Sequence, residues 1–141
     1  MTDSDPVLAG GCGCGAVRFA ASEPPQSAVY CHCTRCQART GTAAQASARV
    51  APGSVTIIAG AEHLRDWTLE NGLAKSFCGL CGSHLFARTR DDGEIAVVRM
   101  AAFDGDPGVR PTSRQFVAYA APWEPIPDDG LPCYPEGLPS A

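Results

Sequence analysis

Short apolar runs alternate with polar residues along this chain, and none has the spacing of a long amphipathic helix. Residues 55–59, Val-Thr-Ile-Ile-Ala, form a β-branched run that is typical of a strand. The pattern predicts strands over 16–20, 29–33, 43–50, 55–59, 64–69, 74–77, 84–89, 95–100 and 115–120. A short helix fits only over residues 34–39. We therefore predict an all-β fold of short antiparallel sheets.

Turn residues separate the predicted strands. Pro52-Gly53 and the Asp-rich segments 91–93 and 104–108 supply this punctuation. Asn71-Gly72 is the best hairpin signal, because both residues tolerate the positive φ that two-residue hairpin turns require. The runs on either side of Asn71-Gly72 are therefore expected to pair as a hairpin.

The two ends of the chain differ in composition from its body. Residues 1–9 are acidic and are expected to form a loose leader. Residues 122–141 hold six of the twelve prolines, which excludes a helix or a central strand and predicts an extended C-terminal arm. The apolar side chains that could lie against the body are Trp123, Ile126, Leu131 and Tyr134.

Length and charge narrow the class of protein. The 141 residues fit one domain, so residues 1–141 are expected to form a single domain. The formal net charge of −4 argues against a nucleic-acid partner, which requires a positive field. No apolar run is long enough to span a membrane, and the N-terminus lacks the features of a secretory signal. We therefore expect a cytoplasmic protein.

The composition is unusual in its eight cysteines. In a reducing compartment, closely spaced cysteines favour metal ligation over disulfides, and zinc is the expected ion. Seven of them form three groups, which are Cys12 with Cys14, then Cys31, Cys33 and Cys36, then Cys78 with Cys81. The eighth, Cys133, could be a further ligand, a resolving thiol or, most commonly for such a residue, a buried small side chain.

The counts of two, three and two cysteines suggest two kinds of site. Two pairs complete one closed four-thiolate site, which is typical of structural zinc. The triplet then keeps an open coordination position, which is typical of catalytic zinc. The alternative, in which the triplet recruits one cysteine from elsewhere, is not excluded by spacing.

The chain resembles a known family in its ordered motifs. These motifs are Gly10-Gly11-Cys12-Gly13-Cys14-Gly15, Cys31-His32-Cys33-Thr34-Arg35-Cys36-Gln37, Phe77-Cys78-Gly79-Leu80-Cys81-Gly82 and Ala121-Pro122-Trp123. They look like those of the glutathione-dependent formaldehyde-activating enzyme family, which also includes centromere protein V. The resemblance extends over residues 10–137 and implies a β-tent fold with two zinc ions.

The resemblance also implies roles for the cysteines. It places a structural zinc on Cys12, Cys14, Cys78 and Cys81, and a catalytic zinc on Cys31, Cys33 and Cys36. The reaction that names the family joins formaldehyde to glutathione and gives S-hydroxymethylglutathione. The implied activity is thus that of a carbon–sulfur lyase, with a small thiol such as glutathione and an aldehyde as substrates.

Other polar residues near the cysteines have two interpretations each. Arg35 and Arg39 could bind the carboxylates of a glutathione-like substrate or could form the solvated face of a short helix. His32 lies between two ligands on a predicted strand, so its side chain should face away from the metal and be structural. His63 and His84 could act as acid or base, although a lone histidine is usually a packing or surface residue. Trp123 could cover the open site but more commonly would anchor the arm.

Two further functions compete with the lyase. A non-enzymatic zinc module that binds a protein partner would have a closed or metal-free triplet. A thiol redox enzyme similar to methionine sulfoxide reductases would usually carry two C-x-x-C pairs and a separate reactive cysteine. The identity of the ligand in the fourth position beside the triplet separates these hypotheses.

Overall fold

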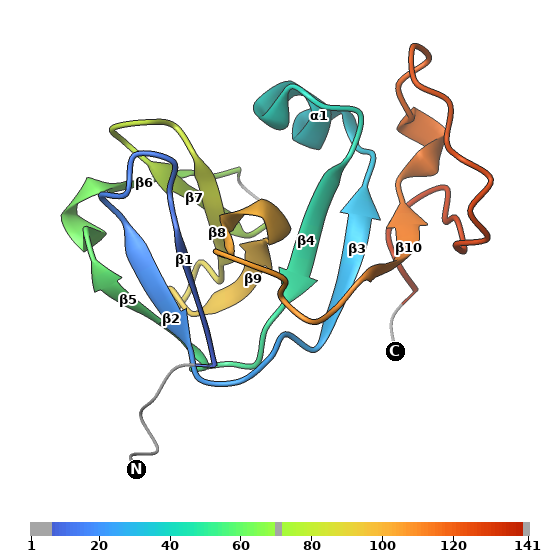
Figure 1. The fold of residues 1–141 in the computed structure, drawn as a ribbon. Coiled ribbons are helices and arrows are strands. Elements are labelled where there is room, and N and C mark those ends of the chain that lie inside the picture. Colours follow the sequence, from blue (N-terminus) through green and yellow to red (C-terminus); the bar gives the residue numbers. More distant parts are fainter. Residues whose placement is uncertain (1–6, 70–71, 140–141) are drawn as a thin grey trace.

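The strands of the described residues form two sheets, and the smaller sheet contains three antiparallel strands (Figure 1). A computed structural model describes residues 7–69 and 72–139 of the chain. In the small sheet, β2 (Arg18–Ala21) lies between β1 (Leu8–Gly11) and β5 (Val55–Ala59). The side chains of Phe19 and Ala21 on β2 are fully buried. This alternation directs one face of the sheet into the core.

The large sheet contains seven strands and positions the cysteine triplet. Their order across the sheet is β10 (Pro111–Gln115), β3 (Ser27–Cys31), β4 (Gln45–Arg49), β9 (Ile95–Arg99), β8 (His84–Arg88), β7 (Ala74–Cys78) and β6 (Leu64–Trp67). All neighbours are antiparallel except β10 and β3, which run parallel. The predicted all-β fold of short sheets is confirmed, with one mixed sheet.

One α-helix, α1 (Thr34–Thr40), lies above the ends of β3 and β4 in Figure 1 and confirms the predicted helix. Cys33 caps its N-terminus, and Gly41 ends it in the left-handed conformation at φ 71°. Three 3₁₀ turns cover Ala61–His63, Met100–Ala102 and Val117–Tyr119. None of the helices described here is long and apolar enough to cross a bilayer.

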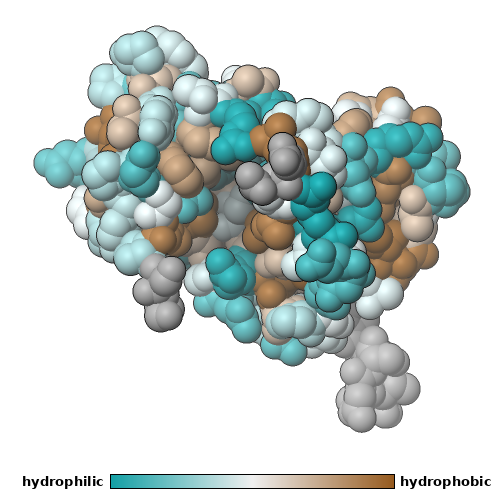
Figure 2. Space-filling view, turned by 180° about the vertical axis from the view of Figure 1, so that it is seen from behind, coloured by the Kyte–Doolittle hydropathy of each residue, from teal (hydrophilic) through white to brown (hydrophobic). Residues whose placement is uncertain are grey.

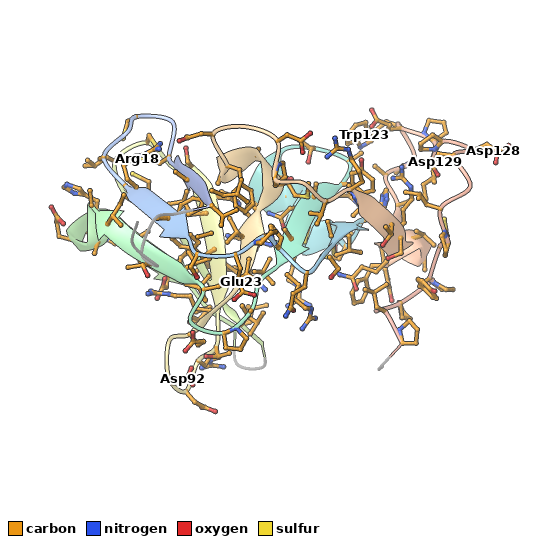
Figure 3. All side chains as sticks on the ribbon, turned by 60° about the horizontal axis from the view of Figure 1, so that its bottom comes forward. Arg18, Glu23, Asp92, Trp123, Asp128 and Asp129 are labelled. Carbon is orange, nitrogen blue, oxygen red and sulfur yellow. The ribbon has the colours of Figure 1, made fainter. Side chains whose placement is uncertain are left out.

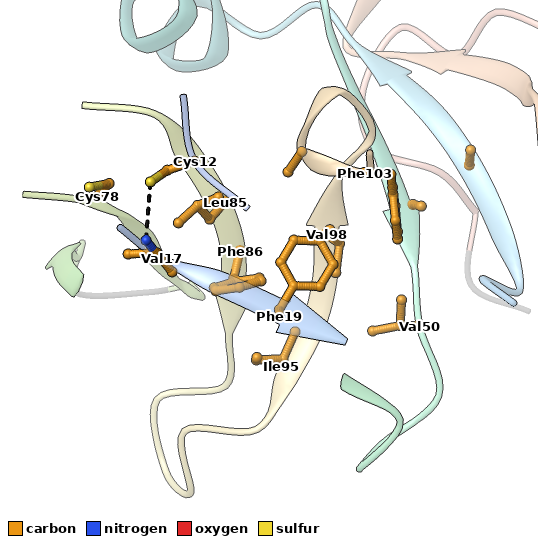
Figure 4. Close-up of a cluster of buried hydrophobic side chains, with 13 residues drawn as sticks. Cys12, Val17, Phe19, Val50, Cys78, Leu85, Phe86, Ile95, Val98 and Phe103 are labelled. Carbon is orange, nitrogen blue, oxygen red and sulfur yellow. Dashed lines mark hydrogen bonds between the residues drawn. The ribbon is translucent and has the colours of Figure 1, made fainter. Parts of the chain in front are cut away.

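Aromatic side chains join the two sheets in the core (Figure 4). The ring of Phe19 on β2 makes edge-to-face contacts with Phe86 on β8, at 5.4 Å, and with Phe103, at 5.6 Å. Such pairs contribute about 1 kcal/mol each beyond the apolar area that they bury. Cys12 and Cys78 belong to the same buried cluster, so two of the predicted zinc ligands are packed against the hydrophobic core.

Three expectations from the sequence are wrong in detail. The strand predicted over 115–120 ends at Gln115, because Phe116 adopts a left-handed conformation at φ 58° and a 3₁₀ turn follows it. The leader predicted over 1–9 is not loose at its end, because Leu8 and Ala9 pair with β2. Trp123 does not anchor the arm, since 65% of its surface is exposed (Figure 3).

The hairpin predicted around Asn71-Gly72 is confirmed by the antiparallel pairing of β6 and β7, while Asn71 itself lies outside the described residues. The segment after Tyr119 has no helix or strand through residue 139, apart from an isolated bridge between Arg114 and Cys133. The segment also hydrogen-bonds along β10, where Tyr134 N donates to Arg114 O at 2.8 Å. These contacts hold the Pro-rich segment on the edge of the large sheet.

Candidate functional site

The two cysteine pairs meet at one corner of the molecule. Cys12 and Cys14 follow β1 in the small sheet, whereas Cys78 and Cys81 lie at the turn between β7 and β8 in the large sheet. Their four sulfurs all lie within 4.8 Å of one another. The Sγ atoms of Cys12 and Cys14 are 3.5 Å apart, and those of Cys14 and Cys78 are 3.9 Å apart. A tetrahedral zinc with bonds near 2.3 Å would require about 3.8 Å between sulfurs, so this cluster fits zinc.

Hydrogen-bond donors around the four sulfurs favour thiolates. Val17 N donates to Cys12 Sγ at 3.2 Å, and Leu80 N approaches Cys78 Sγ at 3.4 Å. Hydrogen bonds from the side chain and backbone of Ser83 lower the pKa of Cys81 to about 5. Cys12 and Cys78 are buried while Cys14 and Cys81 are exposed, so one side of this site borders solvent.

The triplet forms a second cluster at the start of α1. Cys31 ends β3, Cys33 caps the helix and Cys36 lies in its first turn. Their three sulfurs lie within 4.8 Å of one another, and the group contains no fourth His, Cys, Asp or Glu among the described residues. Cys31 is buried, and Cys33 and Cys36 are half-buried. Three ligand atoms at this spacing can hold a zinc ion with one position left for another ligand.

Contacts within the triplet favour the thiolate form of Cys31. Cys36 N donates to Cys33 Sγ at 3.3 Å, and the Cys36 thiol donates to Cys31 Sγ at 3.4 Å. The Cys36 thiol thereby lowers the pKa of Cys31 to about 6, while the pKa of Cys36 itself is raised. A thiolate is the form of cysteine that binds a metal.

The remaining cysteine and two histidines lie outside both clusters. Cys133 is exposed on the arm, so the expectation that it is buried is wrong. His32 is 4% exposed and meets the Arg114 guanidinium at 3.2 Å, which confirms its structural position. His63 faces Glu62 at 3.6 Å at the end of a 3₁₀ turn.

A cleft of about 770 Å³ lies against α1 and β4, at Arg39, Thr40 and Gln45, and reaches the four-cysteine cluster at Cys12. Its lining includes Arg39 but neither Arg35 nor the triplet itself. Arg39 is half-buried, with its guanidinium carbon 5.2 Å from the centre of the Trp67 ring, whereas Arg35 is exposed. The structure thus places only Arg39 of the predicted arginine pair against the cleft.

Sequence analysis missed two residues of this cleft and gave only a generic role to a third. The missed residues are Gln45 on β4 and Arg99 on β9, and the third is His84 on β8. Gln45 and Arg99 are 5% and 9% exposed. The signal was present as polar residues that alternate along 43–50 (Gln45, Ser47 and Arg49) and as the single polar residue Arg99 within 95–100.

Two clusters of thiols at zinc-ligand distances on a two-sheet framework define a candidate zinc-binding β protein. The sequence profile of the glutathione-dependent formaldehyde-activating enzyme family matches residues 7–119, so the chain belongs to that family. No curated protein sequence matches the chain at a significant level. Among solved structures, a Rhodobacter sphaeroides protein matches with a TM-score of 0.55 and 24% identity. The match covers 90% of this chain and 99% of the other, and it supports the fold alone.

Proposed function

We propose that this protein is a zinc-dependent carbon–sulfur lyase that forms or releases the adduct of a small thiol and formaldehyde. Glutathione is the proposed thiol, in keeping with the family to which the chain belongs. The observation that carries the proposal is the triplet Cys31, Cys33 and Cys36, whose sulfurs converge without a fourth protein ligand of the usual types among the described residues. Such a site is open to an exogenous ligand.

The two clusters would hold different zinc ions. Cys12, Cys14, Cys78 and Cys81 would hold a structural ion and complete its shell. The triplet would hold the catalytic ion, which supplies a Lewis acid that favours the thiolate form of an incoming thiol. Since three thiolates already reduce the charge of this ion, the site suits a soft sulfur ligand better than activation of water.

The residues of the chain would position the reaction. The sulfur of the thiol attacks the aldehyde carbon, the carbon–oxygen π bond opens, and the proton given up by the thiol ends on the new hydroxyl oxygen. No oxidant or reductant is consumed. Arg39, and Arg35 from the exposed side of α1, are the proposed binding residues for substrate carboxylates.

The cellular setting is also a proposal. All eight cysteines are free in the structure, which is compatible with a reducing cytoplasm. A folded single domain over residues 1–141 that contains both zinc ions is the proposed functional unit.

Exchange NMR on the zinc-loaded protein tests the proposal. Protein added to glutathione and formaldehyde should raise the rate of adduct formation above the spontaneous rate. Cys33→Ser should abolish the increase, whereas Cys133→Ser, which changes an exposed cysteine outside both clusters, should keep it. A spontaneous rate in the presence of the zinc-loaded wild-type protein would overturn the lyase proposal and favour a non-enzymatic zinc module.

A further inference from the structure

Three buried nitrogen atoms on the cleft have no partner within the described part of the chain. They are Nε2 of Gln45, Nδ1 of His84 and Nε of Arg99. Gln45 and Arg99 are each more than nine-tenths buried. A buried donor without a partner costs about 1–3 kcal/mol, so the two donors Gln45 Nε2 and Arg99 Nε indicate a ligand that accepts hydrogen bonds, while His84 Nδ1 donates or accepts according to its tautomer.

Strand register places these two donors on the same face of the large sheet as Cys31. Gln45 is paired directly with Cys31, and Arg99 is paired with Ser47, two residues farther along β4. Opposed residues share a face of the sheet, and residues i and i+2 on a strand are about 7 Å apart. Arg99 Nη1 donates to Ser47 Oγ at 2.7 Å, which fixes the guanidinium beside Gln45.

Positive charge accumulates at the same place. Arg39 and Arg99 line the cleft and have no ion-pair partner among residues 7–69 and 72–139, although the net charge of the chain is −4. Burial lowers the pKa of Arg99 to about 10, so its guanidinium remains charged at neutral pH. Burial and the nearby Arg39 and Arg99 lower the pKa of His84, which favours the neutral ring.

The triplet does not neutralise this charge once it holds a metal. Three thiolates and one zinc ion carry a net charge of −1, against the two unpaired cations Arg39 and Arg99 that line the cleft. The remaining positive charge and the unpartnered donors favour the same ligand, an oxyanion. A planar carboxylate suits a guanidinium and an amide that lie side by side.

We propose that Gln45 and Arg99, with His84 at the rim, form a carboxylate-binding subsite that makes the protein selective for thiols bearing a negative charge. The identification of the ligand as a thiol rests on the proposed function, whereas the anion subsite rests on the cleft alone. The subsite is separate from Arg35, which is exposed on α1 and does not line the cleft.

Isothermal titration calorimetry on the zinc-loaded protein tests the subsite with two matched probes. The probes are 3-mercaptopropionate and its methyl ester, which share the thiol and differ in the carboxylate. The wild-type protein should bind the acid at least about 10-fold more tightly than the ester, because a charged hydrogen-bond pair is gained. Arg99→Gln should remove most of this preference and leave the affinity for the ester unchanged. The control Arg110→Gln, in an exposed ion pair with Asp106, should keep the preference.

A second variant covers the case in which Arg99→Gln does not fold. Gln45→Leu removes an amide nitrogen that has no partner among the described residues and keeps a similar volume. It should weaken 3-mercaptopropionate about 5-fold. It should also raise the melting temperature of the free protein by about 3 °C, because a buried unpaired donor is lost. A purely structural role for Gln45 would lower the melting temperature instead.

The outcomes separate this inference from the proposed function. Propionate, which lacks the thiol, should compete with 3-mercaptopropionate in the wild-type protein. If propionate binds and neither thiol acts as a substrate, the subsite stands and the lyase proposal fails. If both thiols bind equally and react, the lyase proposal stands and the subsite is overturned. Equal affinities in Gln45→Leu and wild type would also overturn it.

Discussion

At the scale of single residues, the chemistry of this protein depends on sulfur atoms that its turns bring together. The sulfurs of the C-x-C pair Cys12 and Cys14 lie 3.5 Å apart, and those of Cys14 with Cys78 and of Cys31 with Cys36 lie 3.9 Å and 3.4 Å apart. These distances are close to the edge of a zinc tetrahedron. Backbone donors such as Val17 N hydrogen-bond to the sulfurs, and these bonds favour the thiolate form that binds a cation. The same sulfurs would repel one another without a metal.

Cys81→Ala tests the structural role of the four-cysteine cluster. The variant should lose one zinc ion and several kcal/mol of folding free energy, because binding to a structural site is coupled to folding. Zinc content by native mass spectrometry and the midpoint of urea unfolding measure both effects. Cys133→Ala, an exposed cysteine outside the clusters, is the control and should change neither. An unchanged midpoint in a zinc-depleted Cys81→Ala protein would contradict the structural role.

The cysteine clusters were predictable from sequence, but the cleft residues were not. Cysteine spacing within each group is local, so strand or turn geometry predicts that the sulfurs of one group meet. The union of Cys12 and Cys14 with Cys78 and Cys81 was predicted from the count of ligands and from the family resemblance. Gln45 and Arg99 come from β4 and β9, which are far apart in the chain, and only the strand register brings them to Cys31. The structure shows that Arg39 is half-buried and Arg35 exposed, and that Cys133 lies on the surface. The sequence does not give these differences in exposure.

At the scale of elements, β1 must approach the rest of the core closely. Gly10 on β1 has no room for a side chain, because a Cβ there would overlap Ala102 O and lie 2.5 Å from the Phe19 ring. A backbone oxygen and a packed aromatic ring cannot move aside easily. Glycine at this position therefore lets the strand that carries Cys12 reach its place.

Gly10→Ala should lower the free energy of unfolding by about 3 kcal/mol or more through overpacking. Gly105→Ala is the matched control, since a Cβ there meets nothing within 4 Å, and it should be close to neutral. Thermal unfolding followed by circular dichroism gives both values. Equal melting temperatures for the two variants would show that β1 is not packed as described.

The C-terminal arm is held by a partly buried ion pair. Arg114 on β10 lies 4.4 Å from the centre of the Tyr30 ring, and its side chain is 8% exposed. It donates to Asp129 at 2.7 Å, which draws the arm onto the edge of the sheet. Figure 3 shows Asp128 and Asp129 together on the arm, at the far end of the molecule from Arg18.

Asp129→Asn should destabilise the protein by about 1–2 kcal/mol, because it leaves the buried Arg114 without its counter-charge while Asp129 itself is partly solvated. Asp128→Asn, at an exposed neighbour, should have little effect. Chemical unfolding midpoints compare the two. The argument that Asp129 holds the arm fails if both variants unfold with the wild-type midpoint.

Element prediction failed where long-range pairing decided the outcome. Residues 8–11 are short and glycine-rich, so nothing local marks them as a strand until β2 pairs with them. The run 115–120 has strand-like composition, but hydrogen bonds from the 3₁₀ turn to the arm, such as Val117 N to Tyr134 O at 3.0 Å, override it. The helix predicted over 34–39 is present as α1, where Cys33 is the N-cap and its sulfur accepts a hydrogen bond from Cys36 N.

At the scale of the whole molecule, the two sheets are joined in two places, by the hydrophobic core and by the four-cysteine cluster. The surface gives no sign of one broad apolar interface in the view of Figure 2, where hydrophobic residues lie in small groups among hydrophilic ones. The unpaired positive charge of the cleft stands out against the negative net charge. These features are typical of a small-molecule site between elements.

A chelator should remove the two metals in sequence. Three ligands hold an ion less tightly than four, so the triplet should release zinc first and leave the fold intact. Loss of the second ion should coincide with unfolding. Native mass spectrometry and far-ultraviolet circular dichroism during a chelator titration follow the two steps, and unfolding with the first ion would contradict this order.

Cadmium-113 NMR of the protein loaded with two cadmium ions tests the central claim most directly, which is that the triplet is an open site for thiols. Cadmium replaces zinc at thiolate sites and gives one resonance for each environment. We predict two resonances, of which the one from Cys31, Cys33 and Cys36 shifts when glutathione is added, while the one from the four-cysteine cluster stays fixed. The claim would be contradicted if neither resonance changed its chemical shift on addition of glutathione.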